Sequence, residues 1–186
     1  MTGTRMFRRA APARPAWNLA KTLLQIVVMW GMALAVVPLA IDRLAEGAGI
    51  ADFHLPGRRE VGAALFLLFS AGNLYAGVVM SWWGAGTPLP LDTTNRLVAR
   101  GPYAYLRNPM AVGGVGQALS VGVWMGSWPV MAYAILGGLL WNYVARPAEE
   151  EHLLHHFGAE YEEYRRHVRC WIPRLTPYRP GAVRAS

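Results

Sequence analysis

Four long apolar runs limit what this chain can fold into more strongly than any other feature of its sequence. They cover residues 19–41, 61–83, 109–126 and 130–145. The first two are long enough for a helix to cross a hydrocarbon core about 30 Å thick. Because only helices and closed barrels satisfy their backbone polar groups in lipid, the runs predict an all-α, integral-membrane helical bundle of about four transmembrane helices.

The composition agrees with a membrane protein. Hydrophobic residues make up 54% of the 186 residues and charged residues only 16%, which is too apolar for an ordinary soluble domain. The net charge is +7, and nearly all of the positive charge is arginine, because Lys21 is the single lysine. These arginines lie at the ends of the apolar runs, so we expect a lipid bilayer as partner and no nucleic acid. Cys170 is the single cysteine, which excludes an internal disulfide.

The arginines also predict an orientation. The loop between the second and third runs carries Arg96, Arg100 and Arg107 against Asp92, and both ends of the chain are arginine-rich. The positive-inside rule then places this loop and both termini in the cytoplasm. We therefore expect a multi-pass protein of a prokaryotic inner or plasma membrane. Its parts are a disordered basic arm over 1–15, a membrane domain over 16–176 and a tail over 177–186.

The C-terminal part is predicted to form amphipathic cytoplasmic helices. A kink or a restart is expected at Arg146-Pro147, because proline cannot continue the helical hydrogen bonds. A restart would place three glutamates, 149–151, in the positive first turn of a new helix. The helical spacing of Phe157, Tyr161, Tyr164 and Val168 predicts a further amphipathic helix on the membrane surface or over the bundle.

The segment 97–114, LVARGPYAYLRNPMAVGG, is the candidate functional site. An irregular polar segment at membrane depth is tolerated only where it is buried in protein or lines a cavity. Arg107 and Asn108 bring a cation and an amide to the start of the third run, and Tyr103 and Tyr105 offer rings typical of a membrane interface. The predicted orientation puts this segment on the same side as residues 146–151, so we expect the two polar clusters to converge in one pocket.

Several alternatives remain open on the residues alone. The Arg–Glu clusters suit either a functional pocket or a structural network that fixes the helix ends. Gly113 suits either close helix packing or approach to a ligand, and Asn73 suits a ligand contact less well than a hydrogen bond to a neighbouring helix. His152 and His156 lie one turn apart but have neither a glutamate between them nor an evident third ligand, so no metal site is predicted.

Four segments in series resemble the isoprenylcysteine carboxyl methyltransferase and phospholipid methyltransferase superfamily. They are TPLP at 87–90, LVARGPYAYLRNPM at 97–110, RPAEE at 146–150 and FGAEYEEYRRHVRCWIPRL at 157–175. The resemblance implies an integral-membrane enzyme that uses S-adenosylmethionine without a Rossmann domain, with the cofactor site in the C-terminal half, 86–176. It also implies that the family's [RH][HN]P element falls on Arg107-Asn108-Pro109 and its Glu-Glu pair on Glu149-Glu150. This chain departs from many members at Ala111, where they have tyrosine, and at Asn108, where they have histidine.

The resemblance leads to a set of expected site residues. The catalytic residues are expected to be Arg107, Asn108 and Glu150. The cofactor-binding residues are expected to be Tyr105, Arg107, Asn108, Pro109, Gly113, Trp141, Arg146, Glu149 and Glu150. Arginine suits a carboxylate, glutamate suits an ammonium group or ribose hydroxyls, and an aromatic ring suits adenine or a sulfonium.

The expected reaction transfers a methyl group to a lipid or another lipophilic small molecule and releases S-adenosylhomocysteine. Two other functions stay open. One is an NADPH-dependent membrane oxidoreductase of the steroid-reductase kind, whose C-terminal segment can look similar. The other is a non-catalytic membrane scaffold.

Overall fold

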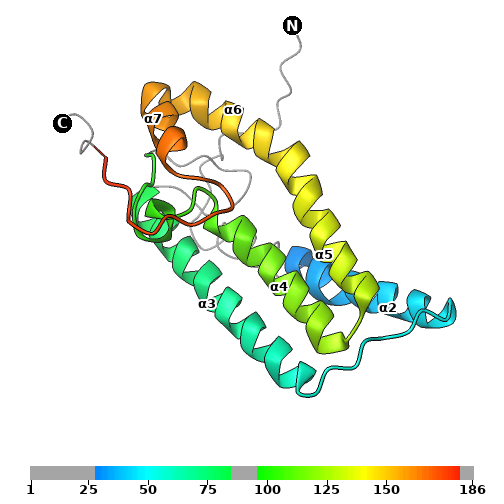
Figure 1. The fold of residues 1–186 in the computed structure, drawn as a ribbon. Helices are drawn as coiled ribbons and strands as arrows, with labels where there is room; N and C mark the ends of the chain where they lie inside the picture. Colours follow the sequence, from blue (N-terminus) through cyan, green and yellow to red (C-terminus); the bar gives the residue numbers. More distant parts are fainter. Residues whose placement is uncertain (1–27, 85–95, 181–186) are drawn as a thin grey trace, which may run out of the picture.

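The computed structural model describes residues 28–84 and 96–180, and this part of the chain is built from helices without strands. Figure 1 shows α3, α4 and α5 packed along one another, with α7 at one end of the bundle. The elements are η1 (Met32–Val36), α2 (Val37–Gly47), α3 (Arg58–Gly84), η2 (Gly101–Ala104), α4 (Pro109–Met125), α5 (Trp128–Leu140), η3 (Trp141–Ala145), α6 (Arg146–Phe157) and α7 (Ala159–His167).

Two helices are long and apolar enough to cross a membrane. One covers Val28–Gly47 in 20 residues and the other Arg58–Gly84 in 27 residues. Only 11% of the most apolar window of each helix is buried inside the protein, whereas the core helix of a soluble protein is mostly buried. The first of these helices ends at Gly47, beyond residue 41, where its apolar run was predicted to end. Its predicted beginning, the arm over 1–15 and the TPLP segment at 87–90 lie outside the described residues.

The start and end of α4 lie close to those of the predicted run 109–126, and local residues account for both. The Asn108 side chain caps the helix by accepting a hydrogen bond of 3.0 Å from the Ala111 N–H, and Pro109 is the first helical residue. Gly126 ends the helix with φ +76°, a conformation that glycine adopts without strain. Ser127 then occupies the N-cap position of α5, although its side chain makes no capping hydrogen bond.

Close packing joins α3 to α4. The Asn73 Nδ2 donates to Gln117 Oε1 at 2.9 Å, and Gln117 Nε2 donates to Ser70 Oγ at 2.8 Å. A Cβ atom on Gly113 would overlap the Asn73 side chain, and one on Gly116 would overlap the Phe69 ring. Of the two interpretations of Gly113, the structure supports helix packing, and Asn73 hydrogen-bonds the neighbouring helix as favoured.

Of the kink or restart expected at Arg146-Pro147, the restart is wrong. The backbone stays right-handed helical through Leu140, Ala145 and Arg146, so α5, η3 and α6 form one continuous helix from Trp128 to Phe157. The N–H of Arg146 donates to the carbonyl of Trp141, five residues earlier, as in a π-helix. A wide turn just before the proline thus allows the helix to continue, and the glutamates at 149–151 do not lie at a free helix N-terminus.

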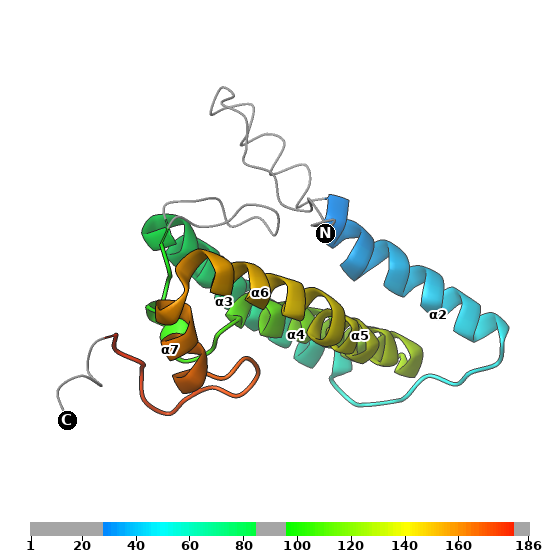
Figure 2. The same cartoon turned by 90° about the horizontal axis from the view of Figure 1, so that it is seen from above.

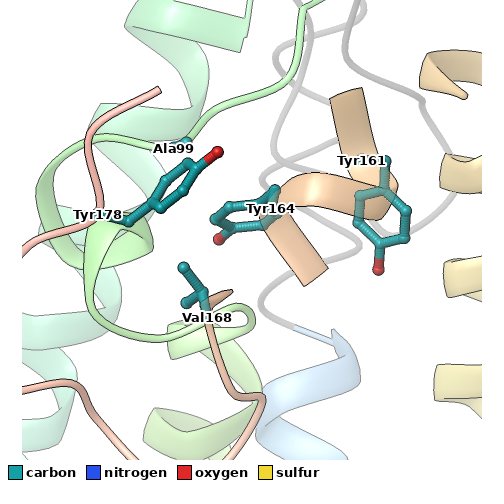
Figure 3. Packing of buried hydrophobic residues seen from close by; sticks show 5 residues of the cluster. All are labelled: Ala99, Tyr161, Tyr164, Val168 and Tyr178. Atoms are coloured by element: carbon teal, nitrogen blue, oxygen red, sulfur yellow. The ribbon is translucent and has the colours of Figure 1, made fainter. Parts of the chain in front are cut away.

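Helix α7 and the segment after it pack against the chain between α3 and α4. Gly158 separates α6 from α7 at φ +54°. Figure 3 shows Tyr161, Tyr164 and Val168 with Ala99 and Tyr178 in one buried cluster. The Tyr178 N–H donates to the Ala104 carbonyl at 2.9 Å. The folded part therefore extends beyond residue 177, where the sequence placed the start of a tail. In Figure 2, turned by 90°, α7 again lies at one end of the bundle.

Candidate active site

A partly open cavity of about 70 Å³ lies where the end of α3, the segment 97–108, the η3–α6 helix and α7 meet. A ligand larger than a few water molecules has to extend through its mouth. The residues that line it are Met80, Leu97, Val98, Tyr103, Arg107, Asn108, Trp141, Arg146, Glu149, Glu150, Leu153, Tyr161, Tyr164 and Cys170.

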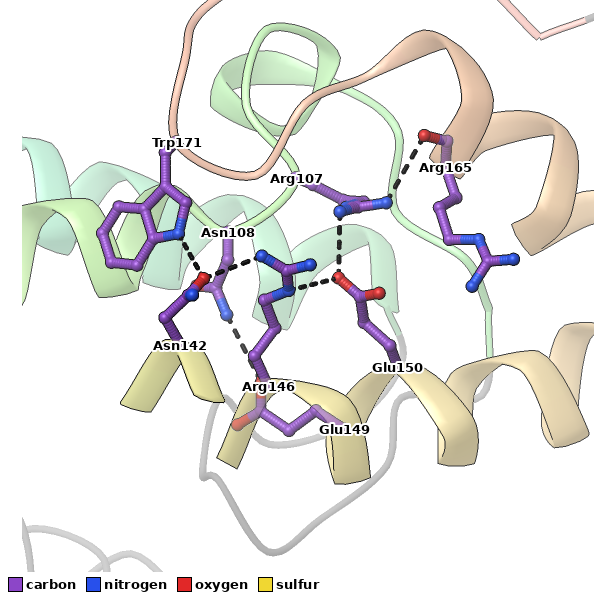
Figure 4. Close-up of polar contacts among 8 residues, drawn as sticks. All are labelled: Arg107, Asn108, Asn142, Arg146, Glu149, Glu150, Arg165 and Trp171. Atoms are coloured by element: carbon purple, nitrogen blue, oxygen red, sulfur yellow. Dashed lines mark hydrogen bonds and ion pairs between the residues drawn. The ribbon is translucent and has the colours of Figure 1, made fainter. Parts of the chain in front are cut away.

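The carboxylate of Glu150 joins the two predicted polar clusters. Its Oε1 lies 2.9 Å from Arg107 Nη2 and 3.0 Å from Arg146 Nε (Figure 4). The side chains of Glu150 and Arg107 are only 16% and 11% exposed, so water screens this pair weakly. The convergence predicted from the sequence is therefore confirmed: Arg107 and Glu150 come from distant segments and meet in one pocket.

The second glutamate contacts the other polar residue of the segment before α4. Asn108 Nδ2 donates to Glu149 Oε2 at 3.4 Å, while its Oδ1 caps α4. Burial raises the pKa of the Glu149 carboxyl above its ordinary value, a hydrogen bond with Trp141 lowers it, and the charge of Glu150 raises it. Glu149 is thus the carboxyl in this pocket that takes up a proton more readily than an exposed glutamate.

Asn142 holds the other arginine in place, a role that was not predicted from the sequence. Its Oδ1 accepts one hydrogen bond from Arg146 Nη1 and another from Trp171 Nε1, both at 2.7 Å (Figure 4). The Trp171 ring also meets Trp141 edge-on, with 5.6 Å between the ring centroids. The segment after α7 therefore supports the wall of the pocket that carries Arg146.

The segment after α7 also fixes the backbone around Arg107. The Arg107 N–H donates to the Arg169 carbonyl at 2.9 Å, and the Arg174 N–H donates to the Tyr105 carbonyl at 3.0 Å. The Arg107 Nη1 donates to the Arg165 carbonyl at 3.4 Å. Helix α7 and the following chain thereby hold this guanidinium against Glu150.

Three tyrosines line the pocket, and sequence reasoning did not assign any of them to it. Tyr103 was expected at a membrane interface, but it is only 4% exposed. Its carbonyl accepts a hydrogen bond of 2.8 Å from the Tyr164 hydroxyl. Burial raises the pKa values of Tyr103, Tyr161 and Tyr164, so all three stay protonated near neutral pH. The helical spacing predicted that the last two are buried, but not what they face.

Three expected cofactor-binding residues do not line the cavity. Tyr105 lies outside it and is 38% exposed, because its backbone pairs with Arg174 and leaves the ring on the surface. Pro109 begins α4, and Gly113 packs against α3. The other expected residues do line it: Arg107, Asn108, Trp141, Arg146, Glu149 and Glu150.

No cluster in the described part of the chain has the composition of a metal site, since no three His, Cys, Asp or Glu side chains gather there. The rings of His152 and His156 stack with centroids 6.4 Å apart. Burial raises the pKa of the Cys170 thiol, which keeps it protonated and makes it a poor nucleophile.

Comparison with known proteins assigns the family. No curated protein matches the chain. The family model of phospholipid methyltransferases matches residues 58–160, which is more than half of the chain and runs from the start of α3 into α7. The match includes every residue of the Arg107–Glu150–Arg146 and Asn108–Glu149 contacts. The chain therefore belongs to the phospholipid methyltransferase family, a family of membrane methyltransferases within the isoprenylcysteine carboxyl methyltransferase-like superfamily.

Proposed function

We propose that this protein is an integral-membrane methyltransferase that transfers a methyl group from S-adenosylmethionine to a lipid or another lipophilic small molecule. The observation that carries the proposal is the pocket in which Arg107, Arg146 and Glu150 meet beside Asn108 and Glu149. It lies at one end of a bundle of apolar helices, where a polar cofactor and an apolar acceptor can both arrive.

The residues of the pocket fit such a cofactor. Two guanidinium groups suit its carboxylate, and Glu149 or Glu150 suits its ammonium group or ribose hydroxyls. The Trp141 ring offers a flat surface for adenine. Two buried donors, Tyr103 Oη and Arg107 Nε, have no hydrogen-bond partner within residues 28–84 and 96–180, so the pocket has unused polar capacity. When bound, S-adenosylmethionine supplies an electrophilic methyl group on a sulfonium.

The chain's own contribution is alignment and exclusion of water. We assign Arg107, Glu150 and Asn108 the role of holding the polar part of the site in one geometry. Alignment of the reactants in this way lowers the activation barrier of a group transfer by several kcal/mol. A carboxylate or thiolate acceptor needs no base. For a protonated amine acceptor, Glu149 is the group suited to remove a proton, because its raised pKa brings it closer to neutrality.

The apolar lining supports a lipophilic acceptor. Met80, Leu97, Val98 and Leu153 line the pocket next to the charged residues. Met80 belongs to α3, whose outward side chains Leu67, Leu68 and Leu74 are more than 60% exposed, as expected of a surface that faces lipid.

We also propose that the chain crosses the membrane four times. Helix α4 has 17 residues, or about 25 Å, and α5 continues through η3 before the charged α6 begins. Trp82 and Trp83 are exposed at the end of α3, and the Arg100 guanidinium lies 4.8 Å from the centroid of the Trp83 ring. Exposed tryptophans with arginine are typical of a membrane interface, so we assign the pocket end of the bundle to the cytoplasmic face, together with both ends of this chain.

Titration of the purified protein in detergent or nanodiscs with S-adenosylhomocysteine tests the proposal. Saturable binding is expected, and no binding would overturn it. Binding of NADPH instead would favour the oxidoreductase, and binding of neither ligand by the folded protein would favour a scaffold. Mass spectrometry of lipid extracts incubated with protein and S-adenosylmethionine then identifies the acceptor as the molecule that gains one CH₂ unit.

A further inference from the structure

Tyr103 is a buried polar residue that the fold does not explain. Its ring packs against Ala76, Val79 and Val98, which accounts for its apolar part. Its hydroxyl oxygen is buried, yet no residue in the described ranges hydrogen-bonds to it. A buried hydroxyl without a partner destabilises a protein, and a phenylalanine would fill the same space without that penalty.

Arg107 carries a second unused donor in the same pocket. Its Nη2 pairs with Glu150 and its Nη1 donates to the Arg165 carbonyl. Its Nε is buried and has no hydrogen-bond partner among the residues described, and the other side chain that bonds to this guanidinium is the Cys170 thiol, whose sulfur is a weak acceptor. Both Tyr103 and Arg107 line the cavity.

Both unused groups can donate, and this limits what they can bind. A guanidinium has no acceptor. The Tyr103 hydroxyl keeps its proton because burial raises its pKa. The hydroxyl can also accept, but the guanidinium can only donate, so a ligand group that binds both atoms has to offer acceptor positions, and a carboxylate has about four.

We infer that the Tyr103 hydroxyl and Arg107 Nε bind a carboxylate group, that of the methionine part of the cofactor. The inference rests on the proposed function, since it assigns one end of the proposed cofactor to these two atoms. Tyr103 is then a binding residue that contacts the amino-acid end of the ligand, and not its adenine or ribose.

The test compares two ligands that differ in this end. S-adenosylhomocysteine carries the carboxylate, and 5′-methylthioadenosine keeps the adenosine and the thioether but lacks the amino-acid part. We expect Tyr103→Phe to bind S-adenosylhomocysteine about tenfold or more weakly in calorimetric titration, which is the typical effect of losing a hydrogen bond to a charged group. Its affinity for 5′-methylthioadenosine should equal that of the wild type.

Thermal unfolding without ligand separates binding from folding. Tyr103→Phe should unfold at the same temperature as the wild type or higher, because it removes an unpaired buried hydroxyl. The matched control is Tyr164→Phe. The hydroxyl that this change removes donates a hydrogen bond of 2.8 Å to the Tyr103 carbonyl, so the variant should unfold at a lower temperature than the wild type. A lower unfolding temperature for Tyr103→Phe would mean that the hydroxyl serves the fold, and would overturn the inference.

The remaining outcomes separate this inference from the proposed function. If the wild type binds neither ligand, the proposed function is wrong. If the wild type binds both and Tyr103→Phe keeps full affinity for S-adenosylhomocysteine, only the role of Tyr103 is wrong. An equal loss of affinity for both ligands would also overturn the inference, because the hydroxyl would then shape the whole pocket.

Discussion

Glu150 Oε1 lies 2.9 Å from Arg107 Nη2, and this ion pair joins the segment before α4 to the helix that follows η3. The same oxygen lies 3.0 Å from Arg146 Nε, so one carboxylate balances two guanidinium groups. The ion pair lies where the segments 97–110 and 146–150 meet. We therefore expect both the stability of the protein and cofactor binding to depend on it.

Replacement of Glu150 by glutamine should destabilise the protein and abolish cofactor binding. It leaves two poorly exposed guanidinium groups without a counter-charge, which we expect to lower the free energy of unfolding by about 1–3 kcal/mol. The matched control is Glu162→Gln, whose more exposed carboxylate pairs with Arg165 and Arg166 on the surface of α7 and should cost less than about 1 kcal/mol. Denaturant unfolding in micelles and titration with S-adenosylhomocysteine measure both effects. Equal stability of the two variants would contradict the structural role of Glu150.

Asn142→Ala should weaken cofactor binding although Asn142 does not line the pocket. The change removes the oxygen that accepts hydrogen bonds from Arg146 and Trp171, and so frees the Arg146 side chain. We expect a loss of about 1–3 kcal/mol in stability and weaker binding of S-adenosylhomocysteine. Asn142→Asp keeps an acceptor oxygen and should recover most of the affinity. If aspartate performed no better than alanine, the proposed positioning role would have to be dropped.

Glu149 should make the stability of the protein depend on pH. Its pKa is raised in the folded protein, so the unfolded chain loses this proton more readily. The stability contributed by the protonated carboxyl is complete below pH 4.5, the ordinary value, and is lost as the pH rises through the folded-state pKa. We expect the melting temperature of Glu149→Gln to fall less than that of the wild type from pH 4.5 to neutrality. Glu151→Gln, at an exposed position, controls for the change in net charge and should follow the wild type.

Gly113→Ala should disturb the helix pair and not the chemistry of the pocket. The added methyl group would overlap the Asn73 side chain and force α3 and α4 apart, at about 1–3 kcal/mol. Gly137→Ala is the control, because a Cβ atom there meets nothing within 4 Å. The double variant Asn73→Ala, Gly113→Ala should regain part of the lost stability in thermal unfolding. If Gly113→Ala instead abolished ligand binding at unchanged stability, Gly113 would have to contact the ligand.

The sequence predicted those features that depend on local signals. Helix α4 covers Pro109–Met125, close to the predicted run 109–126, because the proline at its start and the glycine after its end each act within one turn. The meeting of Arg107 with Glu150 could also be predicted, since charge patterning placed both segments at the same end of the bundle.

Two kinds of feature were not predicted from the sequence. A proline usually ends a helix, so the continuous helix through Arg146-Pro147 could not be read from the local pattern. The roles of Asn142 and Tyr103 were not predicted because they depend on contacts between distant segments. An asparagine at the end of an apolar run and a tyrosine in a loop are ordinary residues until Trp171, in the segment after α7, contacts the first and Tyr164 of α7 contacts the second.

The π-helical turn at Trp141–Ala145 has a consequence for the direction of the residues that follow it. Each residue of an α-helix advances the side chains by about 100° around the axis. A π-turn takes up more residues per turn than an α-helix, so if the same five residues wound as an ordinary α-helix, Glu149 and Glu150 would be rotated around the axis away from Arg107. The exposed surface of this helix can accept many apolar residues, but the winding between Leu140 and Arg146 is fixed by the direction in which the two carboxylates must point.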